Sequence, residues 1–246
     1  MAKEKKVAFI TGGNRGIGLE TARQLGKQGV AVVIGSRDAA KGKAIAEKLR
    51  AEGADVQAIR FDITRPADYQ EAYGFFEKNF GKLDILVNNA GIAKEPFGAP
   101  NNASSVSGAV LRETFDTNVF GTIELTQALL PLIKKASEGR IVNLSSILGS
   151  LTLHADPNSP IYGFKALAYD ASKAALNAFT VHLAAELRDT KVKVNSAHPG
   201  WVKTDMGTDA APMEIPEGAK TSVQLALLPA DGPTGGYFHM GEALPW

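Results

Sequence analysis

The stretch VAFITGGNRGIG at residues 7–18 decides the fold. It opens on an apolar run that is typical of a buried strand, and apolar residues with helical spacing follow it directly. Gly12, Gly16 and Gly18 lie between the two, and glycines at such a turn let the backbone approach a pyrophosphate at the positive end of the helix dipole. The stretch therefore predicts a nucleotide-binding turn between a strand and a helix; a tight turn without a ligand is the alternative.

Strand-like and helix-like segments alternate along the rest of the chain. The other apolar runs expected to be strands lie at 31–34, 56–61, 84–87, 140–144, 192–197 and 236–240. Continuous apolar runs are typical of parallel strands that helices cover on both faces. No repeat, linker or change of composition interrupts the pattern. It therefore predicts one domain over residues 1–246, an α/β doubly wound sheet of about seven mostly parallel strands with right-handed crossovers and helices on both faces.

The overall composition excludes several classes of function. Lys and Arg number 27 against 26 Asp and Glu, so no basic excess favours nucleic acid or an anionic membrane as a partner. No apolar run reaches the ~20 residues of a membrane span, and the N-terminus has no signal-like stretch. With no Cys there is no disulfide or thiolate chemistry, which fits a reducing cytoplasm. We therefore expect a cytoplasmic protein that binds neither nucleic acid nor membrane.

Arg37 and Asp38 follow the second apolar run, where dinucleotide-binding proteins recognise the ribose. An acid at this place binds the ribose 2′-hydroxyl, whereas an arginine suits a 2′-phosphate. Asp38 also precedes a helical run at 39–49, where it would serve as the N-cap. Arg37 together with Arg15 therefore favours a phosphorylated nucleotide, and Asp38 as the ribose ligand is the alternative.

Tyr169 and Lys173 are four residues apart at the start of an expected helix, so their side chains lie on the same face. A free phenol, with a pKa near ~10, is a poor acid or base at neutral pH. A nearby cation favours the phenolate and lowers that pKa. The pair is therefore a candidate acid/base, and an exposed helical pair without a function is the alternative.

Other polar residues lie where open α/β sheets bind ligands. Ser145 and Ser146 follow one expected strand. The stretch Asn-Asn-Ala-Gly at 88–91 follows another, and its small and amide side chains either approach a ligand or brace neighbouring strands. Asn118 lies in a helical pattern expected at 110–132, where an asparagine normally faces solvent or bonds back to the backbone.

Metal and hydrolytic chemistry are not supported. The histidines do not stand at metal-ligand spacings, and no His-Glu-x-x-His or Cys motif exists, so we expect no metal. The serine pair lacks the Gly-x-Ser-x-Gly pattern of hydrolases. The four histidines are His154, His182, His198 and His239; of these, His154 is expected to lie in a loop or to line a pocket.

In their order along the chain, these motifs resemble the short-chain dehydrogenase/reductase family in its single-domain branch, and more narrowly its carbonyl reductases. The stretches 117–122, 199–206 and 225–229 resemble the carbonyl reductases. The resemblance implies a Rossmann-type fold with the cofactor half at about 1–145 and the substrate pocket mainly at 146–220. The family motifs are matched by Thr11, Gly12, Gly16, Gly18, Asp62, Asn88, Asn89, Ala90, Gly91, Asn118, Ser146, Tyr169, Lys173, Pro199 and Gly200.

The resemblance also implies roles for individual residues. Tyr169 would be the proton donor in carbonyl reduction, and Ser146 would bind the carbonyl oxygen. Lys173 would lower the pKa of Tyr169 and contact the nicotinamide ribose, and Asn118 would hold a water that links Lys173 to solvent. The implied cofactor is NADP(H), held by Gly12, Asn14, Arg15, Gly16, Ile17, Gly18, Arg37, Asp62, Ile63, Asn89, Ala90, Gly91, Tyr169, Lys173, Pro199, Gly200, Val202 and Thr204.

The chain departs from the family pattern between Ser146 and Tyr169, which are 23 positions apart, more than in the compact members. The extra residues lie at 151–168, and this insertion is shorter than in the related carbonyl reductases. Tyr162 within it has no Lys four residues on, so Tyr169 is the better candidate. A dimer, a tetramer and a monomer all stay open.

The insertion is expected to be an ordered turn that forms one wall of the substrate pocket, facing the loop after Gly200. Its expected apolar anchors are Leu151, Ile161, Phe164 and Leu167. A second loop is expected at 94–108.

These patterns together favour an NADPH-dependent reductase that converts a small ketone or aldehyde into an alcohol. One alternative is a family member that acts mainly as an alcohol or sugar dehydrogenase, because a proton relay runs in both directions. Another is a protein that binds NADP as a sensor without turnover.

Overall fold

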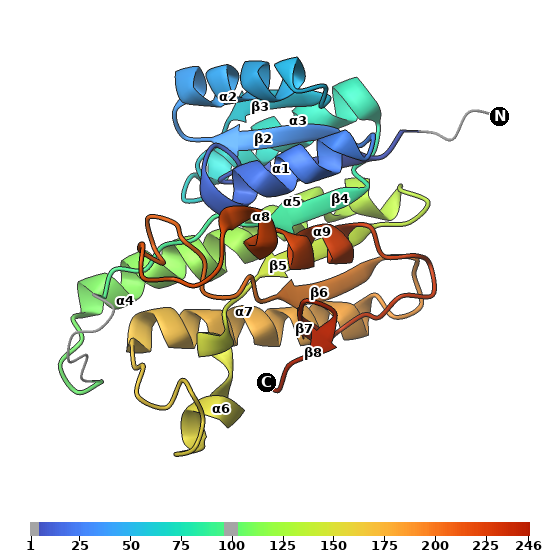
Figure 1. Cartoon of the computed structure of the whole chain (residues 1–246). Helices are drawn as coiled ribbons and strands as arrows, with labels where there is room; N and C mark the ends of the chain where they lie inside the picture. Colours follow the sequence, from blue (N-terminus) through green and yellow to red (C-terminus); the bar gives the residue numbers. More distant parts are fainter. Residues whose placement is uncertain (1–4, 96–102) are drawn as a thin grey trace.

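An eight-stranded sheet runs through the computed structural model, which describes residues 5–95 and 103–246 (Figure 1). The strand order is β3-β2-β1-β4-β5-β6-β7-β8. The first seven strands are parallel, and only β8 pairs in the antiparallel sense, with β7. The strands are β1 (Val7–Thr11), β2 (Ala31–Ser36), β3 (Val56–Arg60), β4 (Ile85–Asn88), β5 (Arg140–Leu144), β6 (Lys193–Ala197), β7 (Tyr237–His239) and β8 (Glu242–Ala243).

The predicted fold class, an α/β doubly wound sheet, is confirmed, with one strand more than the expected seven. The additional strand is β8, which has only two residues and is too short to show an apolar pattern in the sequence. The helices are α1 (Gly16–Lys27), α2 (Ala39–Ala51), α3 (Pro66–Phe80), α4 (Gly108–Phe115), α5 (Gly121–Lys134), α6 (Leu151–Ala155), α7 (Leu167–Glu186), α8 (Ile215–Gly218) and α9 (Lys220–Ala226).

Alternate residues of each strand serve two separate cores, one on each face of the sheet. Phe9 of β1 packs on one face with Phe76 of α3 and Leu125 of α5. Its neighbour Ile10 packs on the other face with side chains of α1, α2 and α9, such as Leu25. Figure 1 shows the same arrangement, with α3, α5 and α7 behind the sheet and α1 and α9 in front of it. Both faces are therefore covered, as the continuous apolar runs predict.

The helix expected at 110–132 is not continuous. A π-helical turn, Asp116–Phe120, separates α4 from α5. It turns Asn118 inward, where the side chain is buried, which corrects the expectation of a solvent-facing asparagine. Gly121 follows this turn directly and packs against the loop after β3. A Cβ on Gly121 would lie only 2.2 Å from the Ile63 carbonyl oxygen. Turns of this type are frequent at functional sites.

The segment before α7 is more regular than expected. A 3-10 helix, Ile147–Gly149, and α6 both lie in it, because Ser146 and Ser150 cap them: the Ser146 hydroxyl accepts from the Leu148 N–H and the Ser150 hydroxyl from the Leu153 N–H. The last helical region of the chain is divided into α8 and α9.

Only one of the four expected anchors of the insertion is buried. Ile161 is 7% exposed, whereas Leu151 is 67%, Phe164 49% and Leu167 38% exposed. Hydrogen bonds hold the insertion instead, because the Trp246 carbonyl accepts from the Thr152 N–H at 2.9 Å. The expected loop at 94–108 lies partly outside the described residues, which resume at 103, and α4 begins within it at Gly108. In the part of the chain that is described, no helix has both the length and the apolar character needed to cross a membrane.

Candidate active site

The glycine turn after β1 lies against the end of β4, at the point where the strand order reverses. The Thr11 hydroxyl accepts from the N–H groups of Asn89 and Ala90, both at 3.0 Å. In return the Asn89 amide donates to the carbonyl oxygens of Thr11 and Gly12. The Asn89 side chain therefore braces the turn, one of the two interpretations left open for this amide, and its contact with a cofactor stays a prediction.

The start of α1 fits a phosphate group. Arg15 is the N-cap residue, and its side chain caps none of the orphan N–H groups of the first turn. The turn is also a cradle that only glycine can form: a Cβ on Gly18 would lie 2.4 Å from Asn89 Nδ2 and 2.7 Å from the Gly12 carbonyl oxygen. Gly16 has a φ of +53° and lies beside Thr204. Backbone N–H groups at a helix N-terminus, brought close by glycines, are the usual site for a nucleotide phosphate.

Gly18→Ala is expected to destabilise the protein by about 1–3 kcal/mol, the usual cost of overpacking, and to weaken nucleotide binding because the turn must open. Gly74→Ala is the matched control, since Gly74 lies inside α3 with no atom within 4 Å of its Cβ. That change should stabilise the helix by about 0.5–1 kcal/mol. Urea unfolding of both variants checks this, and equal stabilities for the two would show that the turn has room for a side chain.

Tyr169, Lys173 and Ser146 lie together at the carboxyl end of β5. The Tyr169 and Ser146 hydroxyls are hydrogen-bonded to each other. Lys173 donates to the Leu144 carbonyl oxygen at 2.7 Å, and its Nζ lies 5.6 Å from the centroid of the Tyr169 ring. Gly149 lets the 3-10 helix pack on α7 here, because a Cβ would lie 2.9 Å from the Lys173 backbone carbon. By contrast, Tyr162 is exposed, with Lys165 over its ring, which favours Tyr169 as the candidate acid.

Burial dominates the electrostatics of this pair. It raises the pKa of Tyr169 to about 12, against the opposing hydrogen bond from Ser146, and the nearby Asp170 raises it further. Burial also lowers the pKa of Lys173 to about 8. The net pKa of Tyr169 is therefore raised in this structure, since desolvation outweighs the nearby cation and the Lys173 ammonium bonds to Leu144. The Tyr169 hydroxyl keeps its proton at neutral pH and is available as a donor.

Asn118 joins this group from the π-helical turn. Its amide donates to the Ile92 carbonyl and to the Ser172 hydroxyl, and its Oδ1 accepts from the Ile92 N–H. Gly91 lies between Asn118 and Lys173, because a Cβ there would stand 3.3 Å from Asn118 Oδ1 and 3.5 Å from Lys173 Nζ. The side chain thus fastens the chain after β4 to α7. Ser172, its partner, carries no signal in the sequence.

The residues expected at the ribose end lie at the end of β2. The Asp38 side chain accepts from the Lys41 N–H at 3.0 Å, so its interpretation as the N-cap of α2 is confirmed. Arg37 is exposed, and it lies close enough to Asp62 for its positive charge to lower the Asp62 pKa. Burial alone would raise the pKa of Asp62, but two hydrogen bonds from Thr64 and the cations of Arg37 and Arg60 lower it.

Arg15 forms an exposed ion pair with Asp205, which lies in the segment that follows β6. Thr204, one residue before, lies beside Gly16, and Val202 is buried and bridges to Met213. Of the expected cofactor residues after β6, Thr204 is therefore brought to the glycine turn. Pro199 and Gly200 begin this segment, and Gly200 has a φ of +89°.

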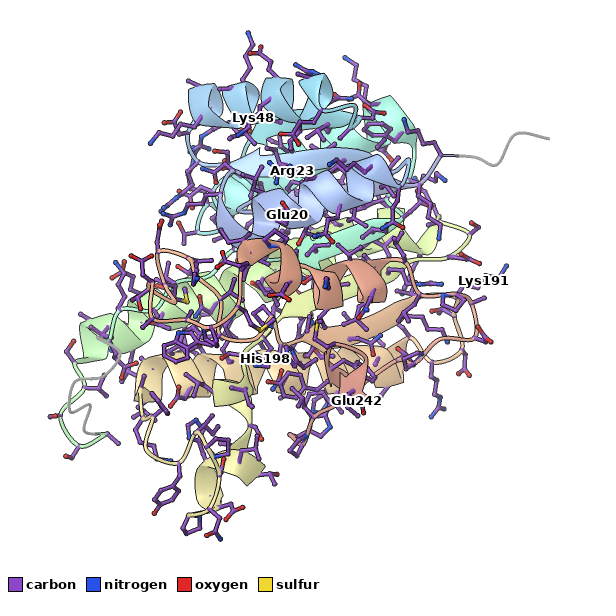
Figure 2. All side chains as sticks on the ribbon, viewed as in Figure 1. Glu20, Arg23, Lys48, Lys191, His198 and Glu242 are labelled. Carbon is purple, nitrogen blue, oxygen red and sulfur yellow. The ribbon has the colours of Figure 1, made fainter. Side chains whose placement is uncertain are left out.

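His198 is a site residue that the sequence reasoning missed. Its Nδ1 accepts from the Ile147 N–H at 3.1 Å and from the Gly200 N–H at 3.4 Å, so it joins the segment after Ser146 to the segment after β6. The side chain of His198 is labelled in Figure 2. Burial, together with the neighbouring His239, lowers the pKa of His198 to about 3 and keeps the ring neutral. Its place directly before Pro199 is the only signal in the sequence. Among the described residues, no group of three or more His, Cys, Asp or Glu side chains is arranged to hold a metal ion.

Comparison with known proteins agrees with this geometry. A family model described as short chain dehydrogenase matches residues 6–215. Carbonyl reductase (NADPH) 1 of Mus musculus is 32% identical over 284 residues, with 100% of both chains covered. The structure of salutaridine reductase from Papaver somniferum matches with a TM-score of 0.83 at 30% identity, over 96% of this chain and 100% of that chain. NADPH-bound carbonyl reductase from chicken fatty liver matches with a TM-score of 0.84 at 27% identity, over 99% of this chain and 100% of that chain.

Proposed function

The chain belongs to the short-chain dehydrogenase family of oxidoreductases, and from this premise we propose that it reduces a small ketone or aldehyde to an alcohol with NADPH. One observation carries the proposal: the buried Tyr169 hydroxyl, which keeps its proton at neutral pH, is bonded to Ser146 and lies next to Lys173 at the carboxyl edge of the sheet. The names of the relatives, a carbonyl reductase and a salutaridine reductase among them, support the same reaction.

The cofactor residues proposed from the sequence fit this function. The uncapped start of α1 and the glycine cradle would hold the pyrophosphate, and Arg37 would meet the 2′-phosphate. The 199–204 segment would cover the nicotinamide end of the cofactor. When bound, NADPH supplies the hydride that reduces the carbonyl carbon.

The chain's own residues would activate and protonate the carbonyl oxygen. The hydroxyls of Ser146 and Tyr169 would donate hydrogen bonds to it, which stabilises the negative charge that develops during reduction. The Tyr169 hydroxyl would then give its proton to the alkoxide. Lys173, positioned by its bond to Leu144, would stabilise the phenolate left behind, and Asn118 would hold this part of α7 in place.

Turnover measurements separate this function from its alternatives. The wild-type protein is incubated with NADPH and a panel of ketones and aldehydes, and with NADP⁺ and the matching alcohols, while NADPH absorbance is followed. The proposal expects turnover of several carbonyl compounds. Stoichiometric NADPH binding without turnover would support a sensor, and faster oxidation of alcohols at neutral pH would support a dehydrogenase.

We also propose that the insertion at 151–168 forms a wall of the substrate pocket, and Phe164 offers a direct test. This side chain is half-exposed, so apolar substrates gain contact area from it. Covering some 50 Å² of apolar surface contributes about 1 kcal/mol, or roughly fivefold in affinity. Phe164→Ala should therefore lower kcat/KM about fivefold for bulky apolar ketones, and much less for small ones.

The control for the insertion is Val181→Ala, because Val181 is also a half-exposed apolar residue but lies on α7. Neither change should affect the KM for NADPH by more than about twofold, since no cofactor contact is removed. Equal losses for every substrate with Phe164→Ala would mean that the insertion serves folding or assembly.

A further inference from the structure

The first turn of α7, which carries Tyr169, is capped by two carboxyl groups, one from the segment after β4 and one from α7 itself. Its N-cap residue is Ala166, which has no polar side chain of its own. Glu95, from the segment after β4, accepts from the Tyr169 N–H at 3.0 Å. Asp170 accepts from the Ala166 N–H at 2.9 Å. Two carboxyl groups therefore satisfy helix donors at the backbone of the candidate acid.

His154 of the insertion connects this turn to the segment after Ser146. Its Nε2 lies 3.0 Å from the Leu148 carbonyl oxygen and 3.3 Å from Asp170 Oδ2, whereas its Nδ1 lies 3.1 Å from Lys165 Nζ. Nε2 must carry the proton, because both of its neighbours are acceptors, and Nδ1 accepts from Lys165. His154 thus lies in α6 rather than in a loop, and it links the two segments that present Tyr169 and Ser146.

The two carboxyl groups lie in a poorly hydrated place. Glu95 is only 9% exposed and the Asp170 side chain 13%. Within the part of the chain that is described, Asp170 Oδ1 has no hydrogen-bond partner. Burial raises the pKa of Asp170 to about 7, the charge of Glu95 raises it further, and the cation of Lys165 opposes the shift. Asp170 is therefore a buried acid whose second oxygen is uncompensated when it ionises.

We propose, as a refinement of the reductase function above, that Glu95, Asp170 and His154 are positioning residues for Tyr169 and that reduction slows when Asp170 ionises. A second carboxylate beside Glu95 repels it, which loosens the turn that Glu95 holds. The charged and titratable groups that face Asp170 are Glu95, His154, Lys165 and Tyr169. The sequence at 96–102, next to Glu95, contains no titratable side chain.

The first experiment compares Glu95→Ala with Glu95→Gln. The alanine removes the acceptor for the Tyr169 N–H, and kcat should fall about tenfold with the KM for NADPH within twofold, because a small misplacement of a reacting group is costly. The glutamine keeps an acceptor oxygen and should retain kcat within about threefold. The matched control is Glu113→Ala, which removes an exposed acid paired with Lys94 and should be silent.

The second experiment follows kcat from pH 5.5 to 8.5 for the wild type and for Asp170→Asn. The wild type should lose about threefold to tenfold as pH rises through about 7, and the loss should vanish in Asp170→Asn, which cannot ionise. Lys173, with a pKa of about 8, titrates later and is unchanged in the variant, so it does not imitate this result.

Thermal unfolding gives an independent readout of the same group. The folded pKa of Asp170 lies above its ordinary value of 3.8, so the native state binds more protons and stability falls as pH rises from about 4 to 7. Asp170→Asn should therefore have a higher Tm than the wild type at pH 8, an advantage that shrinks at pH 5.

The outcomes keep this proposal distinct from the reductase function. A wild type without turnover overturns the reductase function itself, and the Tm comparison then still tests the buried acid. Identical pH profiles of the wild type and Asp170→Asn, or equal losses in Glu95→Ala and Glu95→Gln, overturn the proposed positioning role.

Discussion

Tyr169→Phe is expected to lower kcat for carbonyl reduction by at least about 10²-fold, the lower range for loss of a general acid. The substitution keeps the buried ring and removes only the hydroxyl, which is bonded to Ser146. NADPH should still bind with an affinity within a few-fold of the wild type, because the glycine turn and Arg37 lie elsewhere. Steady-state kinetics and a fluorescence titration with NADPH measure the two effects separately.

Tyr162→Phe is the matched control for this prediction. Tyr162 is also a tyrosine with a lysine nearby, but it is exposed in the insertion. Loss of the Tyr162 hydroxyl should leave kcat within about threefold of the wild-type value. If Tyr162→Phe abolished activity and Tyr169→Phe did not, the assignment of the acid would be wrong.

The fold was predictable wherever hydrophobic periodicity carries the information. The strand at 140–144 and the strand before the glycine turn were predicted to the residue, because runs that are covered on both faces leave a clear apolar signal. The elements that the sequence did not predict are those that local hydrogen bonds form. The π-helical turn at 116–120 carries the hydrogen-bonded Asn118, and α6 is capped by Ser150; no periodicity records such contacts.

The residues of the candidate site likewise fall into those that the sequence predicted and those that it did not. Short-range motifs indicated Tyr169, Lys173 and the glycine turn, and the predicted resemblance to the short-chain dehydrogenase/reductase family is confirmed. Glu95 and His198 were missed, because each acts on backbone groups more than 50 positions away in the chain. The net rise of the Tyr169 pKa could not be predicted either, since burial is a property of the packed fold and not of the four-residue spacing.

The choice of cofactor provides a second large effect, because it depends on charge. The wild type should prefer NADPH over NADH by at least tenfold in kcat/KM. A charge-assisted hydrogen bond between Arg37 and the 2′-phosphate contributes about 1.5–3 kcal/mol, and about 1.4 kcal/mol corresponds to a factor of ten. Asp38 is occupied as the N-cap of α2, which removes the main competitor for the ribose.

Arg37→Ala should therefore lose most of this preference, with kcat/KM for NADPH down about tenfold and that for NADH nearly unchanged. Arg15 cannot fully replace it, because its guanidinium is paired with Asp205, and the phosphate must compete with that carboxylate. Arg188→Ala removes an exposed arginine after α7 that pairs with its neighbour Asp189, and it should change neither value. A preference of the wild type for NADH would falsify the assignment of Arg37. It would mean that Asp38 leaves its capping position to bind the ribose, so that Arg37→Ala would be silent.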